Sequence, residues 1–157
     1  MVASQQATLP SMIVTVDVNI LFSALISVNG RLAKLLTDPY APLQRISCHY
    51  AVIELFKHQP KLIKYTKKPL ENILADLSTL INTLQLYNES LIKSHHWQKA
   101  DRFTAGVDSF DISYVALTLQ TGGLLWTGGK KLITHLRAMD FERVITTDEL
   151  YQTIHPA

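Results

Sequence analysis

Cysteine, charged residues and long apolar runs are all scarce in this sequence. The 157 residues include a single cysteine, Cys48, which excludes the internal disulfide framework of a small secreted domain. The most apolar stretch, residues 12–28, is interrupted by Asp17 and Asn19 and therefore does not form a membrane-spanning run. The first eleven residues lack the basic start and the apolar segment of a secretory signal. We therefore expect a cytoplasmic protein without a membrane partner, in which residues 1–11 form a flexible tail.

Glycine and proline are also few. With 6 residues of each and no repeating period, the composition excludes collagen-like and low-complexity chains. Hydrophobic residues make up 47% of the chain, enough for one packed core, and the length suits a single domain. Charged residues make up 18%, below the usual share of about a quarter. This low charge leaves room for an apolar surface patch that a partner covers.

Short β-branched stretches alternate with helical patterns along the chain. The pattern predicts strands at residues 12–16, 44–48, 89–93, 124–126 and 143–145. It predicts helices from residue 19 to the Asn29-Gly30 pair, at 31–36, at 49–57, from Pro60, and at 69–84, 110–120, 131–138 and 147–152. In the helix at 49–57 we expect Val52, Ile53 and Phe56 to face inward. Strands separated by helices predict a single α/β domain over residues 12–157, with three layers and a central, mostly parallel sheet flanked by helices.

One acid falls inside the most apolar stretch of the chain. Asp17 directly follows the first predicted strand, where burial of an unpaired carboxylate costs several kcal/mol. Ligands commonly bind at the carboxyl edge of an open parallel sheet, so Asp17 is a candidate ligand-binding acid. Asn19 is placed to cap the next helix and to orient the Asp17 carboxylate. The alternative is that Asp17 itself only caps this helix.

Three further acids are candidates for the same edge of the sheet. Glu54 lies on an otherwise apolar helix, while Asp108 and Asp111 stand at the start of the helix at 110–120. Converging carboxylates repel one another unless a cation lies between them, and oxygen-only ligands suit Mg²⁺ or Mn²⁺ rather than zinc. Such a cation can activate water for the cleavage of a phosphodiester. Ordinary helix capping is the alternative for Asp108 and Asp111.

Basic residues gather in two places, although the formal net charge is only +2. Five lysines occupy residues 57–68 with no acid between them: Lys57, Lys61, Lys64, Lys67 and Lys68. They form either a solvated helical face or a surface that meets RNA. Lys130, Lys131 and Arg137 follow a glycine turn beside the predicted edge of the sheet, which makes them candidates to hold phosphates of an RNA.

Three ordered segments of the chain carry a resemblance to a known family. They are residues 16–24 (VDVNILFSA), 108–117 (DSFDISYVAL) and 125–132 (LWTGGKKL), with Glu54 between the first two. In this order and spacing the chain resembles a PIN domain, the nuclease fold shared by VapC-like toxins and many RNA-processing enzymes. The resemblance extends from residue 12 to about residue 150.

The resemblance implies a fold, a reaction and a site. It implies a central parallel sheet flanked by helices, a divalent metal such as Mg²⁺ or Mn²⁺, and endonucleolytic cleavage of single-stranded RNA. Asp17, Glu54 and Asp111 match the three core metal-binding and catalytic acids, and Asp108 matches a frequent additional one. Toxin members of the family pair with a small antitoxin and often form homodimers.

Asn19 and Thr127 match the usual polar supports of the family's site, but one position departs from the pattern. In the family's Thr-Gly-Asp turn the third residue is often a fourth acid, and here it is Gly129. Two hypotheses follow: an endoribonuclease, the toxin of a toxin–antitoxin pair, or a catalytically degenerate PIN-like module that binds RNA or a protein without cutting. A third hypothesis is an α/β domain that binds a small ligand and has no nuclease chemistry.

Overall fold

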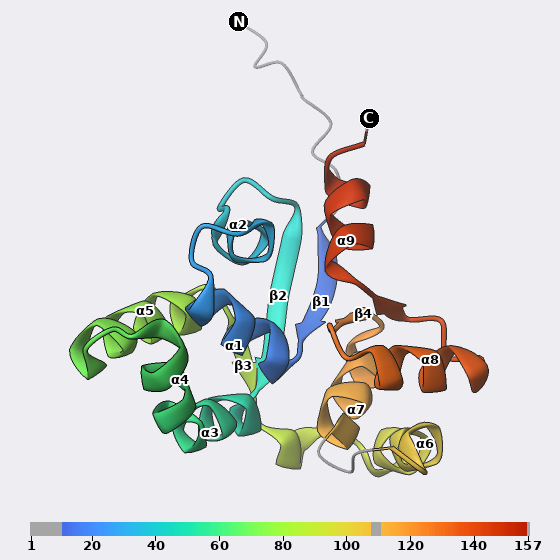
Figure 1. The fold of residues 1–157 in the computed structure, drawn as a ribbon. Helices are drawn as coiled ribbons and strands as arrows, with labels where there is room; N and C mark the ends of the chain where they lie inside the picture. Colours follow the sequence, from blue (N-terminus) through green and yellow to red (C-terminus); the bar gives the residue numbers. More distant parts are fainter. Residues whose placement is uncertain (1–10, 108–110, 157) are drawn as a thin grey trace, which may run out of the picture.

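A five-stranded parallel sheet forms the centre of the domain (Figure 1). The computed structural model describes residues 11–107 and 111–156. The strands are β1 (Met12–Val16), β2 (Leu43–Cys48), β3 (Gln85–Tyr87), β4 (Leu124–Trp126) and β5 (Val144–Ile145). Their order across the sheet is β3-β2-β1-β4-β5, and every neighbouring pair is parallel. The prediction of a single α/β domain with a parallel sheet is confirmed.

Helices cover the sheet in two groups (Figure 1). They are α1 (Val18–Ile26), α2 (Arg31–Thr37), α3 (His49–Lys57), α4 (Gln59–Thr66), α5 (Leu70–Asn82), α6 (Ser94–Thr104), α7 (Ile112–Thr121), α8 (Lys130–Ala138) and α9 (Thr147–Ile154). In one group α1 packs against α2, α3, α4 and α5, and α2 packs against α9. In the other group α6 packs against α7 and α8, and α7 lies on β1, β2 and β4. This arrangement gives the three layers of the predicted architecture.

The core lies between the sheet and these helices. Val14, Val16 and Leu125 are completely buried in the central strands, and residues 113–118 of α7 are all buried. A helix buried all round must be covered on both sides, which α7 achieves between the sheet and α6. Within the described ranges no single helix is long and apolar enough to cross a membrane. The helices α1 and α2 together have the length and composition of a span, but they are bent by 113° at their junction.

Two glycines stand between α7 and β4. As the sequence predicts, this pair ends the helix, and the second glycine allows β4 to approach β1 closely. Gly122 follows the last helical turn with φ of 75°, a left-handed conformation that glycine adopts without steric cost. At Gly123 a Cβ atom would lie 2.5 Å from the carbonyl oxygen of Ile13. The close approach of β4 to β1 therefore requires glycine at this position.

Two local predictions are wrong. The strand expected at 89–93 is instead a 3₁₀ helix, η1 (Glu89–Leu91), because the Asn88 side chain accepts a hydrogen bond from the Ser90 backbone and turns the chain. The third strand is β3, a three-residue edge strand just before this turn. In α3 the buried residues are Ala51 and Leu55, whereas Ile53 and Phe56 are 53% and 48% exposed. This helix lies at the edge of the domain, so only one narrow face of it is covered.

The order of the strands creates a crevice between β1 and β4. From β1 the chain continues to β2 and then β3 on one side, while β4 and β5 lie on the other side of β1. Connections that leave neighbouring parallel strands in opposite directions open a crevice at their carboxyl ends, where ligands bind in open α/β sheets. The residues that directly follow these strands, Asp17 and Thr127, therefore stand at this crevice.

Candidate functional site

Asp17 and Thr127 join the ends of the two central strands. The Thr127 hydroxyl donates a hydrogen bond of 2.6 Å to Oδ2 of Asp17, and both residues are buried. Thr127 Oγ1 also accepts a hydrogen bond of 3.2 Å from the Gly129 backbone N–H. The β1–α1 and β4–α8 junctions are thus held together by a carboxylate rather than by an apolar contact.

Asp17 is the N-cap residue of α1. Its Oδ1 accepts a 3.0 Å hydrogen bond from the Asn19 backbone N–H, which satisfies one free donor of the first helical turn. The prediction that Asn19 caps this helix is wrong, because Asp17 already occupies that position. Asn19 still orients Asp17, but through its backbone and not through its side chain.

Burial makes the charged form of Asp17 costly. Asp17 is only 1% exposed, and this desolvation raises the pKa of its carboxyl above the ordinary value. The hydrogen bonds from Thr127 and Asn19 act in the opposite direction, but burial is the larger effect. Among the residues described, no lysine, arginine or histidine pairs with Asp17. A buried carboxylate with no cationic side chain beside it is typical of a functional site.

A cavity of about 430 Å³ opens beside this junction. Its lining includes Asn19 of α1, Glu54 of α3 and Asp111 at the start of α7, so three of the predicted site residues surround one space. Asp17 itself does not line the cavity, but the two residues that follow it in the chain, Val18 and Asn19, do. Asp108 was predicted to contribute as well, but it lies outside the described residues.

Glu54 makes polar contacts with three other residues that line the cavity. Its Oε1 accepts a 2.5 Å hydrogen bond from the Tyr50 hydroxyl, and its Oε2 lies 3.4 Å from Nε2 of His58. The Lys57 ammonium lies 3.9 Å from Oε1. Tyr50, Lys57 and His58 all line the cavity, and the sequence analysis did not assign them to the site. Their spacing from Glu54, by four, three and four residues on one helical surface, is the signal that could have identified them.

A buried hydroxyl adds an unsatisfied polar atom to the cavity. Tyr114 of α7 is 1% exposed and lines the cavity, and its Oη has no hydrogen-bond partner in the described part of the chain. Burial is the main cause of its raised pKa, and negative charge at Asp17 and Glu54 raises it further. The Val18 backbone N–H lowers this pKa but falls short of a hydrogen bond to Oη. Asp17 and Glu54 are thus both close enough to act on one buried hydroxyl.

The donor chemistry of this region fits a hard divalent cation. Asp17, Glu54 and Asp111 offer carboxylate oxygens, which are the ligands that Mg²⁺ and Mn²⁺ prefer. Across residues 11–107 and 111–156, no three acid, histidine or cysteine side chains converge closely enough to enclose an ion. Glu54 is directed to Tyr50 and His58 instead. The chemistry of a metal site is therefore present: Glu54 and Asp111 line the cavity and Asp17 lies next to the lining residue Val18 in the chain, but these carboxylates do not converge.

The predicted phosphate-binding lysines lie apart from this cavity. Lys130 and Lys131 form the exposed first turn of α8 and do not line it. Between them and Thr127 stands Gly129, the N-cap of α8, with φ of −74°. A Cβ atom there would meet Thr127 Oγ1 at 3.6 Å and Leu132 Cβ at 3.7 Å, which are ordinary contacts. Neither backbone conformation nor space requires glycine at this position.

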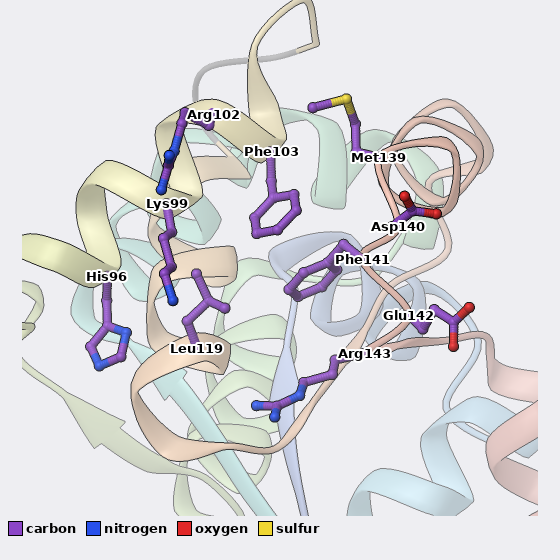
Figure 2. Close-up of a pocket in the computed structure, with 10 residues that line it drawn as sticks. All are labelled: His96, Lys99, Arg102, Phe103, Leu119, Met139, Asp140, Phe141, Glu142 and Arg143. Carbon is purple, nitrogen blue, oxygen red and sulfur yellow. The ribbon is translucent and has the colours of Figure 1, made fainter.

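A larger cavity, of about 830 Å³, lies elsewhere in the molecule. Figure 2 shows Phe103 and Lys99 of α6 on one side of it, and Phe141 and Arg143 of the segment after α8 on the other. None of the predicted site residues lines it. The smaller cavity is lined by two of the predicted acids, Glu54 and Asp111, and by Val18, which directly follows the buried Asp17. The smaller cavity is therefore the candidate site.

Comparisons with known proteins identify the family and the fold. A sequence profile of the PIN domain family matches residues 15–148, from the end of β1 to the start of α9. The fold is similar to the crystal structure of PAE2754 from Pyrobaculum aerophilum, with a TM-score of 0.66, 12% identity and full coverage of both chains. It is also similar to VapBC2 from Rickettsia felis bound to a DNA fragment from their promoter, with a TM-score of 0.60 and 13% identity over 86% of this chain and 97% of that one.

No protein with a curated description matches the chain. The two structural similarities are too low in identity to indicate more than a shared fold. The family profile, however, covers most of the chain, and its range includes the candidate site residues Asp17, Glu54, Asp111 and Thr127. On this match, the chain belongs to the PIN domain family.

Proposed function

We propose that this PIN domain is a divalent-metal-dependent endoribonuclease that cleaves single-stranded RNA in the cytoplasm, as the toxin of a toxin–antitoxin pair. The observation that carries the proposal is the buried Asp17 carboxylate at the crevice between β1 and β4, beside a cavity lined by Glu54 and Asp111. The PIN family match supports nuclease chemistry at this place. A similar fold in VapBC2 supports the toxin–antitoxin assignment.

In this proposal Asp17, Glu54 and Asp111 hold Mg²⁺ or Mn²⁺ through carboxylate oxygens, and Asp108 contributes a further acid. When bound, the ion would lower the pKa of a coordinated water molecule and would stabilise negative charge on the cleaved phosphodiester. The chain's own residues set up this chemistry. Thr127 and the Asn19 backbone fix the Asp17 carboxylate by hydrogen bonds, so it needs no reorganisation when charge develops.

Glu54 must exchange partners in this proposal. In the structure Lys57 and His58 contact its carboxylate, and its Oε1 accepts a hydrogen bond from Tyr50. If Glu54 turned toward a cation, Lys57 and His58 would become available to the phosphates of a bound RNA. The two side chains that contact Glu54 would thus have a second role in binding the substrate.

Cleavage of a fluorescent single-stranded RNA by the purified protein tests the proposal. We expect cleavage in Mg²⁺ or Mn²⁺ that EDTA abolishes, and loss of cleavage in Asp17→Asn and Asp111→Asn. The matched control is Asp101→Asn, which removes one acid from the exposed side of α6. If Asp17→Asn and Asp111→Asn cut as fast as the wild type, while circular dichroism shows that both are folded, the site assignment is wrong.

The second candidate function is a degenerate PIN module that binds RNA or a protein without cutting, and Gly129 favours it. Because a side chain fits at this position without strain, the missing acid can be restored as Gly129→Asp. A large gain of cleavage in this variant over an inactive wild type would support the degenerate module. Cleavage by the wild type that Gly129→Asp leaves unchanged would support the nuclease and exclude a need for a fourth acid.

The proposal includes two protein partners, a small antitoxin and a second copy of the chain. Large apolar side chains on α3, α4 and α5 support it, because they are 40–53% exposed on one group of helices: Ile53, Phe56, Ile63, Leu70 and Leu74. Light scattering on the wild type and on Phe56→Glu tests the homodimer. A monomeric wild type at micromolar concentration would contradict it, as would an unchanged dimer in a variant of every one of these residues.

A further inference from the structure

A second, smaller cavity adjoins the candidate site. It measures about 240 Å³ and shares three lining residues with the first cavity: Asn19, Phe22 and His58. Its remaining lining consists of Lys61 and Tyr65, one helical turn apart on α4. The two cavities therefore adjoin, and Asn19, Phe22 and His58 form their common wall.

The wall and the second cavity are built largely from flat rings. Phe22 and His58 pack edge to face, with ring centroids 6.2 Å apart and planes at 81°. Tyr65 is 59% exposed although its ring adjoins the cavity. Exposed aromatic rings beside a groove are the platforms on which unpaired bases stack, whatever their sequence. An acidic peptide would use the lysines of this groove but would gain little from three rings.

The lysines of residues 57–68 do not all face this groove. Lys57 lines the first cavity and Lys61 the second. Lys64 is exposed on the same helix but lines neither cavity, and Lys68 forms an ion pair of 3.2 Å with Asp76. In the described part of the chain Lys61 has no acidic partner. The basic run is thus divided, and only its first two lysines meet the cavities.

We propose that the second cavity is a subsite for single-stranded RNA, in which Tyr65 and the Phe22–His58 wall stack bases of the strand and Lys61 holds a phosphate one step from the candidate cleavage site. This inference rests on the proposed nuclease function for the position of the cut, but not for the binding itself. Binding at Lys61 and Tyr65 needs no divalent ion.

Binding of a fluorescent single-stranded RNA oligonucleotide in EDTA, measured by anisotropy at several salt concentrations, tests the subsite. Tyr65→Ser should weaken binding about tenfold by removing one stacking platform. Lys61→Gln should lower the slope of log affinity against log salt by about 0.7, the value for one lost phosphate contact on a single strand. Matched controls are Lys64→Gln on the same helix and Tyr40→Ser, whose ring is 92% exposed away from both cavities.

The four substituted side chains are exposed, so all variants should unfold at the wild-type temperature. Equal losses in Lys61→Gln and Lys64→Gln, with none in Tyr65→Ser, would overturn the subsite and indicate diffuse surface charge. Tighter binding of a polyglutamate peptide than of RNA would also overturn it. If RNA binding depends on Tyr65 but the protein never cleaves RNA, the result would support the subsite and contradict the nuclease. If the protein cleaves RNA and Tyr65→Ser binds it as tightly as the wild type, the result would support the nuclease and contradict the subsite.

Discussion

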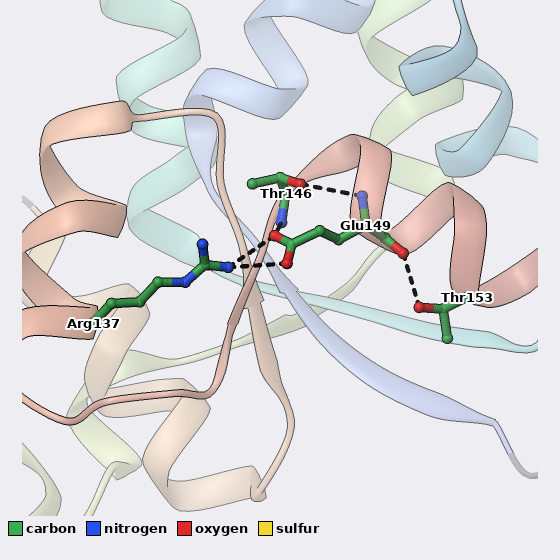
Figure 3. Close-up of polar contacts among 4 residues, drawn as sticks. All are labelled: Arg137, Thr146, Glu149 and Thr153. Carbon is green, nitrogen blue, oxygen red and sulfur yellow. Dashed lines mark hydrogen bonds and ion pairs between the residues drawn. The ribbon is translucent and has the colours of Figure 1, made fainter.

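Two carboxylates of this protein stand at helix N-termini and have opposite environments. Asp17 caps α1 and is buried, with hydrogen bonds from the Asn19 backbone and the Thr127 hydroxyl. Glu149 lies in the first turn of α9, and its side chain is 47% exposed. Figure 3 shows Glu149 between Arg137 and Thr146, in a capping box in which the Thr146 N–H donates to Oε1 at 3.1 Å and Arg137 donates at 2.8 Å.

The two environments shift the pKa in opposite directions. Hydrogen bonds from Arg137 and from the Thr146 backbone lower the pKa of Glu149, and burial is a smaller effect there. Burial raises the pKa of Asp17 despite two hydrogen bonds, because no cationic side chain accompanies it. Glu149 therefore stabilises the fold, whereas the charged Asp17 is a cost to it. The charged form of Asp17 is costly, and Asp17 lies where the two central strands β1 and β4 end. This combination indicates a role in function rather than in folding.

The largest expected effect is on cleavage. Asp17→Asn should reduce the rate of RNA cleavage by about 10³-fold, because it removes a carboxylate that holds the divalent ion, and the ion stabilises the negative charge that develops on the phosphodiester. Glu149→Gln should leave the rate unchanged, since Glu149 lies on the exposed side of α9. Both rates are measured on one RNA under one set of metal conditions. An equal loss of activity in the two variants would contradict the claim that Asp17 acts in function and Glu149 only in folding.

Thr127→Val should have the next largest effect. The change keeps the shape of the side chain but removes the donor to Asp17 and the acceptor of the Gly129 N–H. Loss of a group that orients a metal ligand commonly costs about 10- to 100-fold in activity or metal affinity. Thr153→Val is the matched control, because its hydroxyl donates only to the Glu149 carbonyl on the exposed helix. Equal activity in both variants would show that Asp17 needs no orientation by Thr127.

The pH dependence of unfolding separates the two carboxylates by sign. Asp17 has a raised pKa, so its contribution to stability is present below the ordinary value of 3.8 and is lost as the pH rises through the raised value. Glu149 has a lowered pKa, so its contribution is present above the ordinary value of 4.5 and is lost as the pH falls through the lowered value. Urea unfolding in EDTA measures both.

In these titrations, the loss of stability with rising pH should be smaller in Asp17→Asn than in the wild type. Glu149→Gln should instead be less sensitive to acid. A wild-type pH slope in Asp17→Asn would mean that Asp17 is solvated or paired in solution, which would contradict the burial described above.

The smallest expected effect concerns the capping box. Thr146→Ala removes the side chain that accepts from the Glu149 N–H, and should lower the free energy of unfolding by about 1 kcal/mol. The measurement is urea unfolding at neutral pH, with Thr153→Ala as the control from the same helix. A larger loss in the control would mean that the box does not stabilise α9.

The sequence predicted the fold, and singled out Asp17, for physical reasons that can be stated. Asp17 stood out because a buried acid in the most apolar stretch of the chain needs a partner, and the glycine pair at 122–123 marked the end of α7. Thr127 could be assigned only through the family resemblance, because its partner is 110 residues away in the chain. Contacts of this range leave no periodic signal.

Short or exposed elements were harder to predict. The edge strand β3 has three residues and no alternation long enough to recognise. In α3 the apolar residues Ile53 and Phe56 resemble a core face, and nothing local distinguishes them from Ala51 and Leu55, which are buried. The contacts of Tyr50, Lys57 and His58 with Glu54 follow helical spacing and were within reach of sequence reasoning.

The central claim is that the buried Asp17 carboxylate belongs to a divalent metal site, and thermal unfolding with and without Mn²⁺ tests it most directly. A ligand that binds only the folded state raises the unfolding temperature. We expect saturating Mn²⁺ to raise it by several degrees in the wild type and equally in Glu149→Gln, but not in Asp17→Asn. The same increase in all three proteins would contradict the claim.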